Sequence, residues 1–307
     1  MSYNVVDVER LSRRYDQSLA LDDVTLRMKP GLVYGLVGAN GAGKTTLIKH
    51  LLGLLRAKQG SVRVFGLDPV VHPVQVLQRI GYLSEERDLP EWMRIDELLR
   101  YTSAFHPGWD QAYAQEMLDL FQLDSRKKVK HLSKGMRAQA GLIAAAAHRP
   151  DLLILDEPST GLDAVVRRDI LNTLVRMVAD DGRTALFSSH LLDEVEQMSD
   201  SVFMIDGGRL VLQGDIDEVK QMHARIVVRF SSHSAEFDNI KGLLSAEAEP
   251  YATAGDKTWQ IVCSGEVDSV CRQLTYVGGE VLQSRSANLQ EIFVARASRD
   301  RHHQSIG

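Results

Sequence analysis

The stretch that decides the fold is "GLVYGLVGANGAGKTTLIKHLLGLL", residues 31–55. Its first part is continuously apolar, as in a central strand of a parallel sheet, and its last part carries apolar residues at helical spacing. Between them, "GANGAGKT" matches the pattern G-x-x-x-x-G-K-[ST]. A glycine-rich loop that joins a buried strand to a helix N-terminus directs backbone N–H groups at phosphate oxygens. The stretch therefore predicts an α/β nucleotide-binding fold.

The loop also predicts individual binding residues. Lys44 is expected to reach the β- and γ-phosphates, and the Thr45 hydroxyl is expected to bind Mg²⁺. A chance glycine-rich turn is the alternative, but the strand before the loop and the helix predicted over Lys44 to Leu55 argue against it. The predicted nucleotide-binding residues are Gly38, Ala39, Asn40, Gly41, Ala42, Gly43, Lys44, Thr45 and Thr46.

A second apolar run, "LLILDE" at 152–157, ends in two carboxylates. Asp156 would emerge at the carboxyl end of a buried strand, where α/β sheets bind ligands, and is predicted to hold Mg²⁺. Glu157 follows it and is predicted to polarise a water molecule for attack on the γ-phosphate. A solvated strand end is the alternative, and it is weak beside the phosphate loop.

The bulk composition sets limits on the other functions. The chain has 307 residues, 44% hydrophobic and 25% charged, with a net charge of -5. This balance offers no general attraction for nucleic acid, so no direct nucleic-acid partner is expected. Cys263 and Cys271 are expected to be free thiols. No apolar run approaches the ~18 residues of a membrane-spanning helix, so we expect a cytoplasmic protein.

The pattern of the chain predicts two domains. Residues 1–220 are expected to hold the nucleotide-binding domain, interrupted by a helical subdomain at about 85–149. Residues 221–307 are expected to form a small α+β domain in the order strand, helix, strand, strand, helix, strand, which suits a ferredoxin-like unit. Its first helix is predicted over 235–244, and a last helix over 288–298.

A more specific pattern is "LSKGM", residues 132–136, just before the alanine-rich helix that leads to "LLILDE". It resembles the signature motif of the ATP-binding cassette (ABC) ATPases. In that family the motif closes over the γ-phosphate held by a second cassette. The hydroxyl of Ser133, the amide of Gly135 and the helix N-terminus would form the second anion cradle. The resemblance implies a trans role for Ser133, Lys134, Gly135 and Met136.

Four further stretches agree with this family in type and order. Tyr15 is similar to the aromatic residue that stacks on adenine, and "GYLSEE" (81–86) lies where the glutamine loop belongs. "STGLD" (159–163) resembles the loop through which two cassettes communicate, which includes Asp163. His190 in "SSH" resembles the switch histidine that contacts the γ-phosphate. The resemblance covers about residues 4 to 215.

Each of these residues also has a plainer interpretation. Tyr15 could be a surface aromatic on a strand, and His190 could cap the helix that follows it. Ser133 suits an ordinary N-cap, which is compatible with the signature role. Asp163 could simply cap the helix "AVVRRDILNTL".

The chain also departs from the family pattern. Glu85 stands where glutamine is usual, and Lys134 and Met136 replace the glycine and glutamine of the signature. An ionised glutamate is an acceptor only, so Glu85 is expected to bind the metal and its sensing role to differ. The same holds if Glu86 occupies that position. The other two replacements spare Ser133 and Gly135, so hydrolysis remains expected.

The family resemblance implies an α/β fold of the ABC type: a RecA-like core, an antiparallel β subdomain and a helical insert. It implies ATP and Mg²⁺ as ligands, a second cassette as partner (identical or not), and a separate transmembrane permease subunit. The chain would then lie on the inner face of the cell membrane, and its tail and "LSKGM" favour a bacterial exporter. A soluble cassette ATPase acting on ribosomes or nucleic acid is the main alternative, and a binding-only regulatory cassette is a third.

Overall fold

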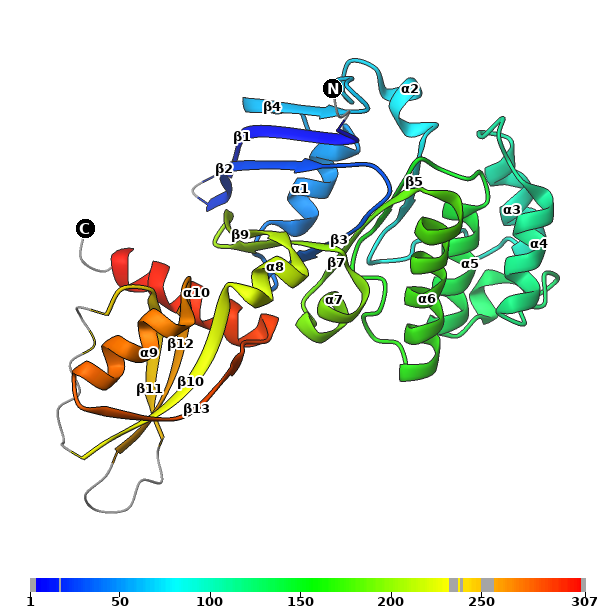
Figure 1. Ribbon diagram of the computed structural model, residues 1–307. Coiled ribbons are helices and arrows are strands. Elements are labelled where there is room, and N and C mark those ends of the chain that lie inside the picture. Colours follow the sequence, from blue (N-terminus) through cyan, green and yellow to red (C-terminus); the bar gives the residue numbers. More distant parts are fainter. Residues whose placement is uncertain (1–3, 17, 232–236, 238–239, 250–256, 305–307) are drawn as a thin grey trace. The chain divides into compact units, whose positions relative to one another are not determined.

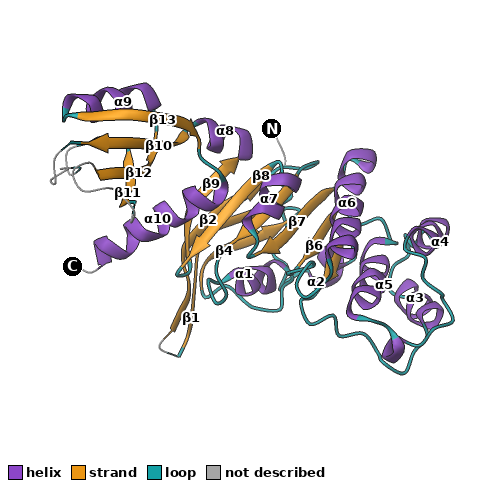
Figure 2. Ribbon diagram, turned by 90° about the horizontal axis from the view of Figure 1, so that it is seen from below, coloured by secondary structure: helices purple, strands orange, loops and turns teal. Residues whose placement is uncertain are grey.

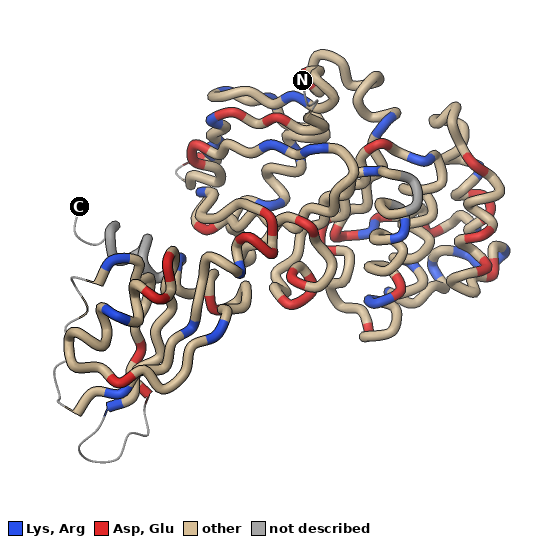
Figure 3. Tube along the Cα trace, viewed as in Figure 1, with Lys and Arg blue, Asp and Glu red and all other residues tan. Residues whose placement is uncertain are grey.

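The computed structural model describes residues 4–304 apart from 17, 232–236, 238–239 and 250–256. The chain divides into two compact units, Met1–Gln213 and Gly214–Gly307. Residues 214–220, which were expected in the first domain, lie in the second unit, which includes helix α8 (Ile216–Gln221). Acidic and basic residues are interspersed along both units (Figure 3).

A six-stranded sheet forms the centre of the first unit (Figure 1). Its order is β5-β6-β7-β3-β8-β9, and the pairs β5–β6, β6–β7, β3–β7 and β3–β8 are parallel. Strands β3, β6 and β7 are buried along their whole length, as expected for strands covered on both faces. The strands are β3 (Val33–Val37), β5 (Ile80–Leu83), β6 (Leu152–Leu155), β7 (Thr184–Ser189), β8 (Ser201–Asp206) and β9 (Arg209–Asp215).

A second, antiparallel sheet has the order β2-β1-β4. It consists of β1 (Val6–Tyr15), β2 (Ser18–Met28) and β4 (Gln59–Val64). Helix α1 (Lys44–Leu51) shares one hydrophobic core with this sheet and with alternate residues of the central sheet, among them Leu36 and Ile154. The other face of the central sheet is covered by α6 (Ala164–Asp181) and α7 (Leu192–Met198), which pack on β7 and β3 (Figure 2).

The helical insert is present as predicted, between β5 and β6. It contains α3 (Ile95–Ser103), α4 (Gln111–Leu120), a short 3-10 helix η1 (Val129–His131) and α5 (Lys134–Ala146). Helices α3, α4 and α5 lie together in Figure 1. Helix α5 packs on β5 and links the insert to the sheet. The sequence analysis missed both β5 and the five-residue helix α2 (Pro73–Leu77), because each is too short to show a clear period.

The predicted extension of the first helix to Leu55 is wrong. Helix α1 ends at Leu51, and Gly53 has a left-handed φ of 71°, which cannot continue a right-handed helix. The apolar spacing continues past this point, but Leu54 is 64% exposed and does not join the core. A left-handed glycine directly after the C-cap Leu52 therefore outweighs the periodic pattern here.

Two stacked histidines lie where the insert meets the sheet. The rings of His106 and His148 are 3.8 Å apart between centroids, and a ring nitrogen of His148 lies 3.2 Å from the carbonyl oxygen of Ile80. Burial, and then the nearby His106 and Arg183, lower the pKa of His148 to about 4. The folded unit therefore holds His148 in its neutral form at physiological pH.

Acid is expected to destabilise the protein through His148. Its pKa is about 4 in the folded protein and takes the ordinary histidine value of 6.5 when the chain unfolds, so the unfolded chain binds more protons between these pH values. The contribution of His148 to the free energy of unfolding is fully present above pH ~6.5 and is lost as the pH falls towards ~4. At pH 5 the loss from this group is about 2 kcal/mol. In His148→Phe the difference in unfolding free energy between pH 7 and pH 5, measured with urea, should shrink by about that amount.

A matched control is His72→Phe, since His72 is exposed. Its pH dependence should equal that of the natural chain. A full wild-type dependence in His148→Phe would show that other groups, such as the buried His223, cause the acid sensitivity.

The second unit is a four-stranded antiparallel sheet in the order β11-β12-β10-β13. Its strands are β10 (His223–Phe230), β11 (Leu243–Ala248), β12 (Lys257–Ser264) and β13 (Gly279–Ser286), with α9 (Val267–Tyr276) and α10 (Leu289–Gln304). One face of β10 packs with α9 in a small core. Both cysteines are free thiols, Cys263 within that core.

The helix predicted over 235–244 has no helical residue among the six that the structure describes: Phe237 and Ile240 lie outside any element, Lys241 and Gly242 form a turn, and Leu243 and Leu244 belong to β11. The prediction is wrong for these residues, and its other four positions, 235, 236, 238 and 239, lie outside the described residues. The ferredoxin-like arrangement of this unit therefore stays a prediction.

Candidate functional site

The predicted site residues of the first unit follow four neighbouring strands. The phosphate loop follows β3, the segment with Glu85 follows β5, Asp156 follows β6 and His190 follows β7. These strands are parallel and adjacent, so their carboxyl ends meet at one edge of the sheet. The fold thus brings segments from 38 to 190 to a single place.

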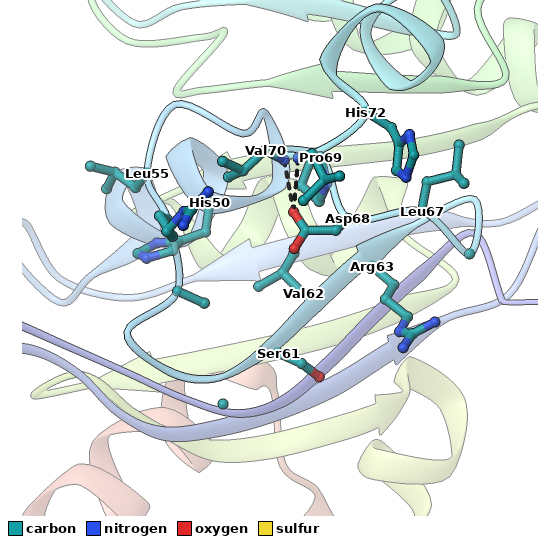
Figure 4. Close-up of a pocket in the computed structure, with 15 residues that line it drawn as sticks. His50, Leu55, Ser61, Val62, Arg63, Leu67, Asp68, Pro69, Val70 and His72 are labelled. Carbon is teal, nitrogen blue, oxygen red and sulfur yellow. Dashed lines mark hydrogen bonds between the residues drawn. The ribbon is translucent and has the colours of Figure 1, made fainter.

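A cavity of about 330 Å³ lies away from the edge of the sheet where the predicted site residues meet. It lies beside α1 and β4, and no residue of the phosphate loop lines it (Figure 4). Its single carboxylate, Asp68, accepts hydrogen bonds from the backbone N–H groups of Val70 (2.8 Å) and Val71 (3.4 Å). Asp68 therefore closes its own turn.

The cavity at the sheet edge has a volume of about 310 Å³ and is lined by the phosphate loop. Glu85 and Glu157 complete its lining, so the structure brings both carboxylates to the loop. Of the predicted nucleotide-binding residues, Tyr15 and Gly38 are not part of this lining. The lining residues are Ala20, Ala39, Asn40, Gly41, Ala42, Gly43, Lys44, Thr45, Thr46, Glu85 and Glu157.

The backbone of the loop requires its glycines. Gly43 has φ 112°, and a Cβ there would lie 2.4 Å from the carbonyl oxygen of Ala20. A Cβ on Gly38 would lie 2.3 Å from the carbonyl oxygen of Ile205. Gly43 is also the N-cap of α1, and no side chain caps this helix. The first backbone N–H groups of α1 therefore have no side-chain acceptor. This is the geometry of an anion cradle.

Lys44 is buried. Lysine is rarely buried without a partner, and the ammonium group of Lys44 has two. Nζ donates to the carbonyl oxygen of Gly38 at 2.8 Å and forms an ion pair with Oε1 of Glu157 at 3.1 Å. The side chains of Lys44 and Glu157 are only 6% and 5% exposed. The ion pair therefore joins the phosphate loop to the end of β6 within the low-dielectric interior.

Glu157 is the centre of the polar network. Its Oε2 accepts from Oγ1 of Thr160 at 3.0 Å and lies 2.8 Å from Nδ1 of His190. Burial by itself raises the pKa of the Glu157 carboxyl, but the bonds from His190, Lys44 and Thr160 outweigh it, and the pKa lies below its usual value. Glu157 is therefore a carboxylate at neutral pH, as a general base must be.

Asp156 and Glu157 are also linked through the next strand. Oγ of Ser188 donates to Oδ1 of Asp156 at 2.6 Å and accepts from the backbone N–H of Glu157 at 2.8 Å. Glu157 itself has φ 47°, an uncommon conformation for a non-glycine residue. One hydroxyl group thus orients both acidic residues.

The residues at this edge fit Mg²⁺. The cation prefers hard oxygen ligands and is commonly bound by one or two carboxylates together with phosphate oxygens. Thr45, Asp156 and Glu85 supply a hydroxyl and two carboxylates, and Thr45 and Glu85 both line the cavity. No cluster of three metal-binding acidic, histidine or cysteine side chains occurs among the described residues, so the phosphates would have to complete the coordination.

The segment after β5 is tied to the segment after β6 by Arg87. Arg87 is 6% exposed, and its Nη2 donates to the carbonyl oxygens of Thr160 (2.8 Å) and Pro158 (3.0 Å). Burial lowers the pKa of Arg87, while the negative charge of Glu85 acts in the opposite direction. The charge that distinguishes Glu85 from a glutamine therefore has a buried cation in its neighbourhood.

The signature residues lie apart from the cavity. Ser133 caps α5, its Oγ accepting from the N–H of Met136 at 3.2 Å, and a Cβ on Gly135 would lie 3.2 Å from the side chain of Val166. Lys134 lines a different cavity of about 610 Å³, together with Glu85 and Arg87. The structure therefore does not bring Ser133, Gly135 or Met136 to this chain's own phosphate loop.

Two of the remaining predicted residues have local partners. Oδ1 of Asp163 accepts from the N–H groups of Val165 and Val166, both at 3.0 Å, so Asp163 is the N-cap of α6. Tyr15 is 41% exposed at the end of β1, with the guanidinium of Arg13 at 4.8 Å from the centre of its ring. An exposed aromatic face is compatible with base stacking.

Sequence reasoning missed three residues of the network: Ser188, Thr160 and Arg87. The first two lie inside the quoted motifs "SSH" and "STGLD", so their position was a usable signal. Arg87 follows "GYLSEE" directly, but nothing local shows that it binds a loop some 70 residues later in the chain.

Known proteins resemble this chain in sequence and structure. The family model described as "ABC transporter" matches residues 21–160. The daunorubicin/doxorubicin resistance ATP-binding protein DrrA of Streptomyces peucetius is 36% identical over 79% of this chain and 75% of its own length. The Nod factor export ATP-binding protein I of Cupriavidus pinatubonensis is 29% identical over 96% of this chain and 91% of its own.

Among solved structures, an "ATP binding subunit of ABC transporter" is 30% identical with a TM-score of 0.65, covering 71% of this chain and 92% of that one. In the described part of the chain, no helix combines the length and apolar character needed to cross a bilayer.

Proposed function

We propose, from the premise that this chain belongs to the ABC transporter family of ATP-binding cassettes, that it hydrolyses ATP to power export through a separate membrane subunit. The observation that carries the proposal is the network in which Glu157 is held between Lys44 and His190 beside the phosphate loop. Relatives whose names state drug resistance and Nod factor export support the direction of transport. The cargo itself would be selected by the membrane subunit.

In this proposal the loop binds the phosphates of ATP through its backbone N–H groups and Lys44, and Tyr15 stacks on the adenine. Thr45, Asp156 and Glu85 would hold Mg²⁺, which would supply positive charge to offset that of the phosphates. Glu157, ionised and oriented by Thr160 and Ser188, accepts a proton from the attacking water. His190 contacts the γ-phosphate from its place beside Glu157.

The proposal also requires a second cassette. Ser133 and Gly135 lie away from this chain's own loop, which supports a role towards the nucleotide of a partner cassette. Only ATP carries the γ-phosphate that both cassettes would grip, so ATP favours the closed dimer and hydrolysis releases it. Shifting an open-to-closed ratio from 1:99 to 99:1 takes about 5.5 kcal/mol of differential binding.

The test is to tag the chain at low copy in its native cells, extract membranes with a mild detergent and identify what co-purifies. We expect a protein with several membrane-spanning helices, and a peripheral location on the inner face of the membrane. Recovery with ribosomes or nucleic acid in the cytosol would leave the ATPase chemistry standing and contradict the transport role.

A further inference from the structure

We propose that Arg87 is a positioning residue for ATP hydrolysis, which holds the loop that carries the base Glu157 to the loop that carries Glu85. The inference rests on the proposed function, because it takes Glu157 as the base. It adds a residue that no motif of the chain contains and that does not line the phosphate-loop cavity.

The first support is the geometry of the clamp. Nη2 of Arg87 points at the turn after β6, where it lies 2.8 Å from the carbonyl oxygen of Thr160, 3.0 Å from that of Pro158 and 3.5 Å from that of Glu157. A positively charged donor on converging carbonyl groups is stronger than a neutral one. The turn from Glu157 to Thr160 is therefore fixed at its backbone by one side chain.

The second support is the path from Arg87 to the carboxylate of Glu157. Thr160 accepts from Arg87 with its carbonyl oxygen and donates with its own hydroxyl to Oε2 of Glu157 at 3.0 Å. Moving the carbonyl of Thr160 would therefore move a hydrogen-bond donor of the base. Displacements of about 1 Å at reacting groups can cost about 100-fold in rate.

The third support is the burial of the charged Arg87 side chain. Arg87 is buried, and its Nε has no hydrogen-bond partner within the described part of the chain. A buried charge is a cost that a purely packing role would avoid with a leucine or methionine.

Arg87 also connects the two carboxylates of the site. It lies two residues after Glu85, and the two side chains share the cavity of about 610 Å³. Glu85 lines the phosphate-loop cavity as well, so a movement of the Glu85 segment would carry the guanidinium and, through it, the turn with Glu157. The clamp thus makes the two loops one unit.

The test compares Arg87→Met in two backgrounds. In the natural chain, we expect kcat for ATP hydrolysis to fall about 10-fold or more, with KM for ATP and the affinity for a fluorescent ATP analogue changed less than about 3-fold. In the Glu157→Gln background, the same substitution should lower the residual turnover less than about 2-fold, because residues that act as a unit are not additive. Hydrogen exchange of the backbone amides of residues 159–163 should become faster.

Arg87→Lys should restore part of the rate, since its ammonium group can still donate to one carbonyl. If Arg87→Met does not fold, the test uses Arg87→Lys instead. Its loss of rate in the natural chain is then compared with its loss of rate in the Glu157→Gln background. Arg94→Met is the control: Arg94 forms an ion pair with Asp96 (2.7 Å) at the start of α3, and its loss should change neither rate.

An equal loss of rate in both backgrounds, or no loss in the natural chain, would overturn the positioning role and leave Glu157 as the base. Unchanged turnover in Glu157→Gln alone would instead remove the base assignment, and with it the premise for Arg87. The two failures are therefore distinguishable in one set of four proteins.

Discussion

Replacing Glu157 with glutamine is expected to slow ATP hydrolysis by about 100-fold or more while ATP still binds. Glutamine keeps the size of the side chain and an oxygen that can accept from Thr160, but an amide cannot take a proton from water at neutral pH. The ion pair with Lys44 (3.1 Å) is lost, yet Lys44 keeps its bond to the carbonyl oxygen of Gly38 (2.8 Å). The phosphate loop should therefore retain its shape.

The measurement is single-turnover hydrolysis of radiolabelled ATP with the variant in excess, beside a direct binding titration. The control is Glu116→Gln, because Glu116 is exposed on α4 and away from the loop. A rate within about 3-fold of the natural chain would contradict the role of Glu157 as base, since a positioned base contributes far more. Loss of binding would show that Glu157 holds the loop instead.

The local parts of this site could be predicted because single short stretches encode them. The phosphate loop requires glycine where φ is positive or a Cβ would clash, as at Gly43 and Gly38, and such requirements are visible in the sequence. The same is true of "LLILDE", where a buried strand must end before Asp156. The family resemblance then supplied the proposed roles of residues such as Ser133, which stay predictions.

The non-local parts could not be predicted in this way. The hydroxyl of Ser188 bonds to two residues that follow another strand, and Arg87 binds carbonyl groups of a distant turn. Such contacts depend on strand order and on side-chain direction, which no spacing in one segment specifies. The end of α1 was mispredicted for a related reason: the apolar pattern continues, and only the backbone of Gly53 shows that the helix does not.

Replacing Lys44 with methionine is expected to weaken ATP binding by about 100-fold. The ammonium group is the buried cation of the phosphate loop, and hydrogen bonds to charged groups contribute about 1.5–3 kcal/mol each, where 1.4 kcal/mol is tenfold in affinity. Methionine has a stem of similar length, so the packing of α1 against the core, through Leu47 and Ile48, should be kept. The measurement is titration with ATP, with circular dichroism to check the fold.

Lys49→Met is the matched control, because Lys49 belongs to the same helix but is exposed. It should bind ATP as the natural chain does. The Lys44 variant has a second expected effect, since Glu157 then loses the lysine that helps to hold its pKa below the usual value against burial. If ATP binding were unchanged while hydrolysis fell, Lys44 would act through Glu157 and not on the phosphates, and the backbone of the loop would have to supply the affinity alone.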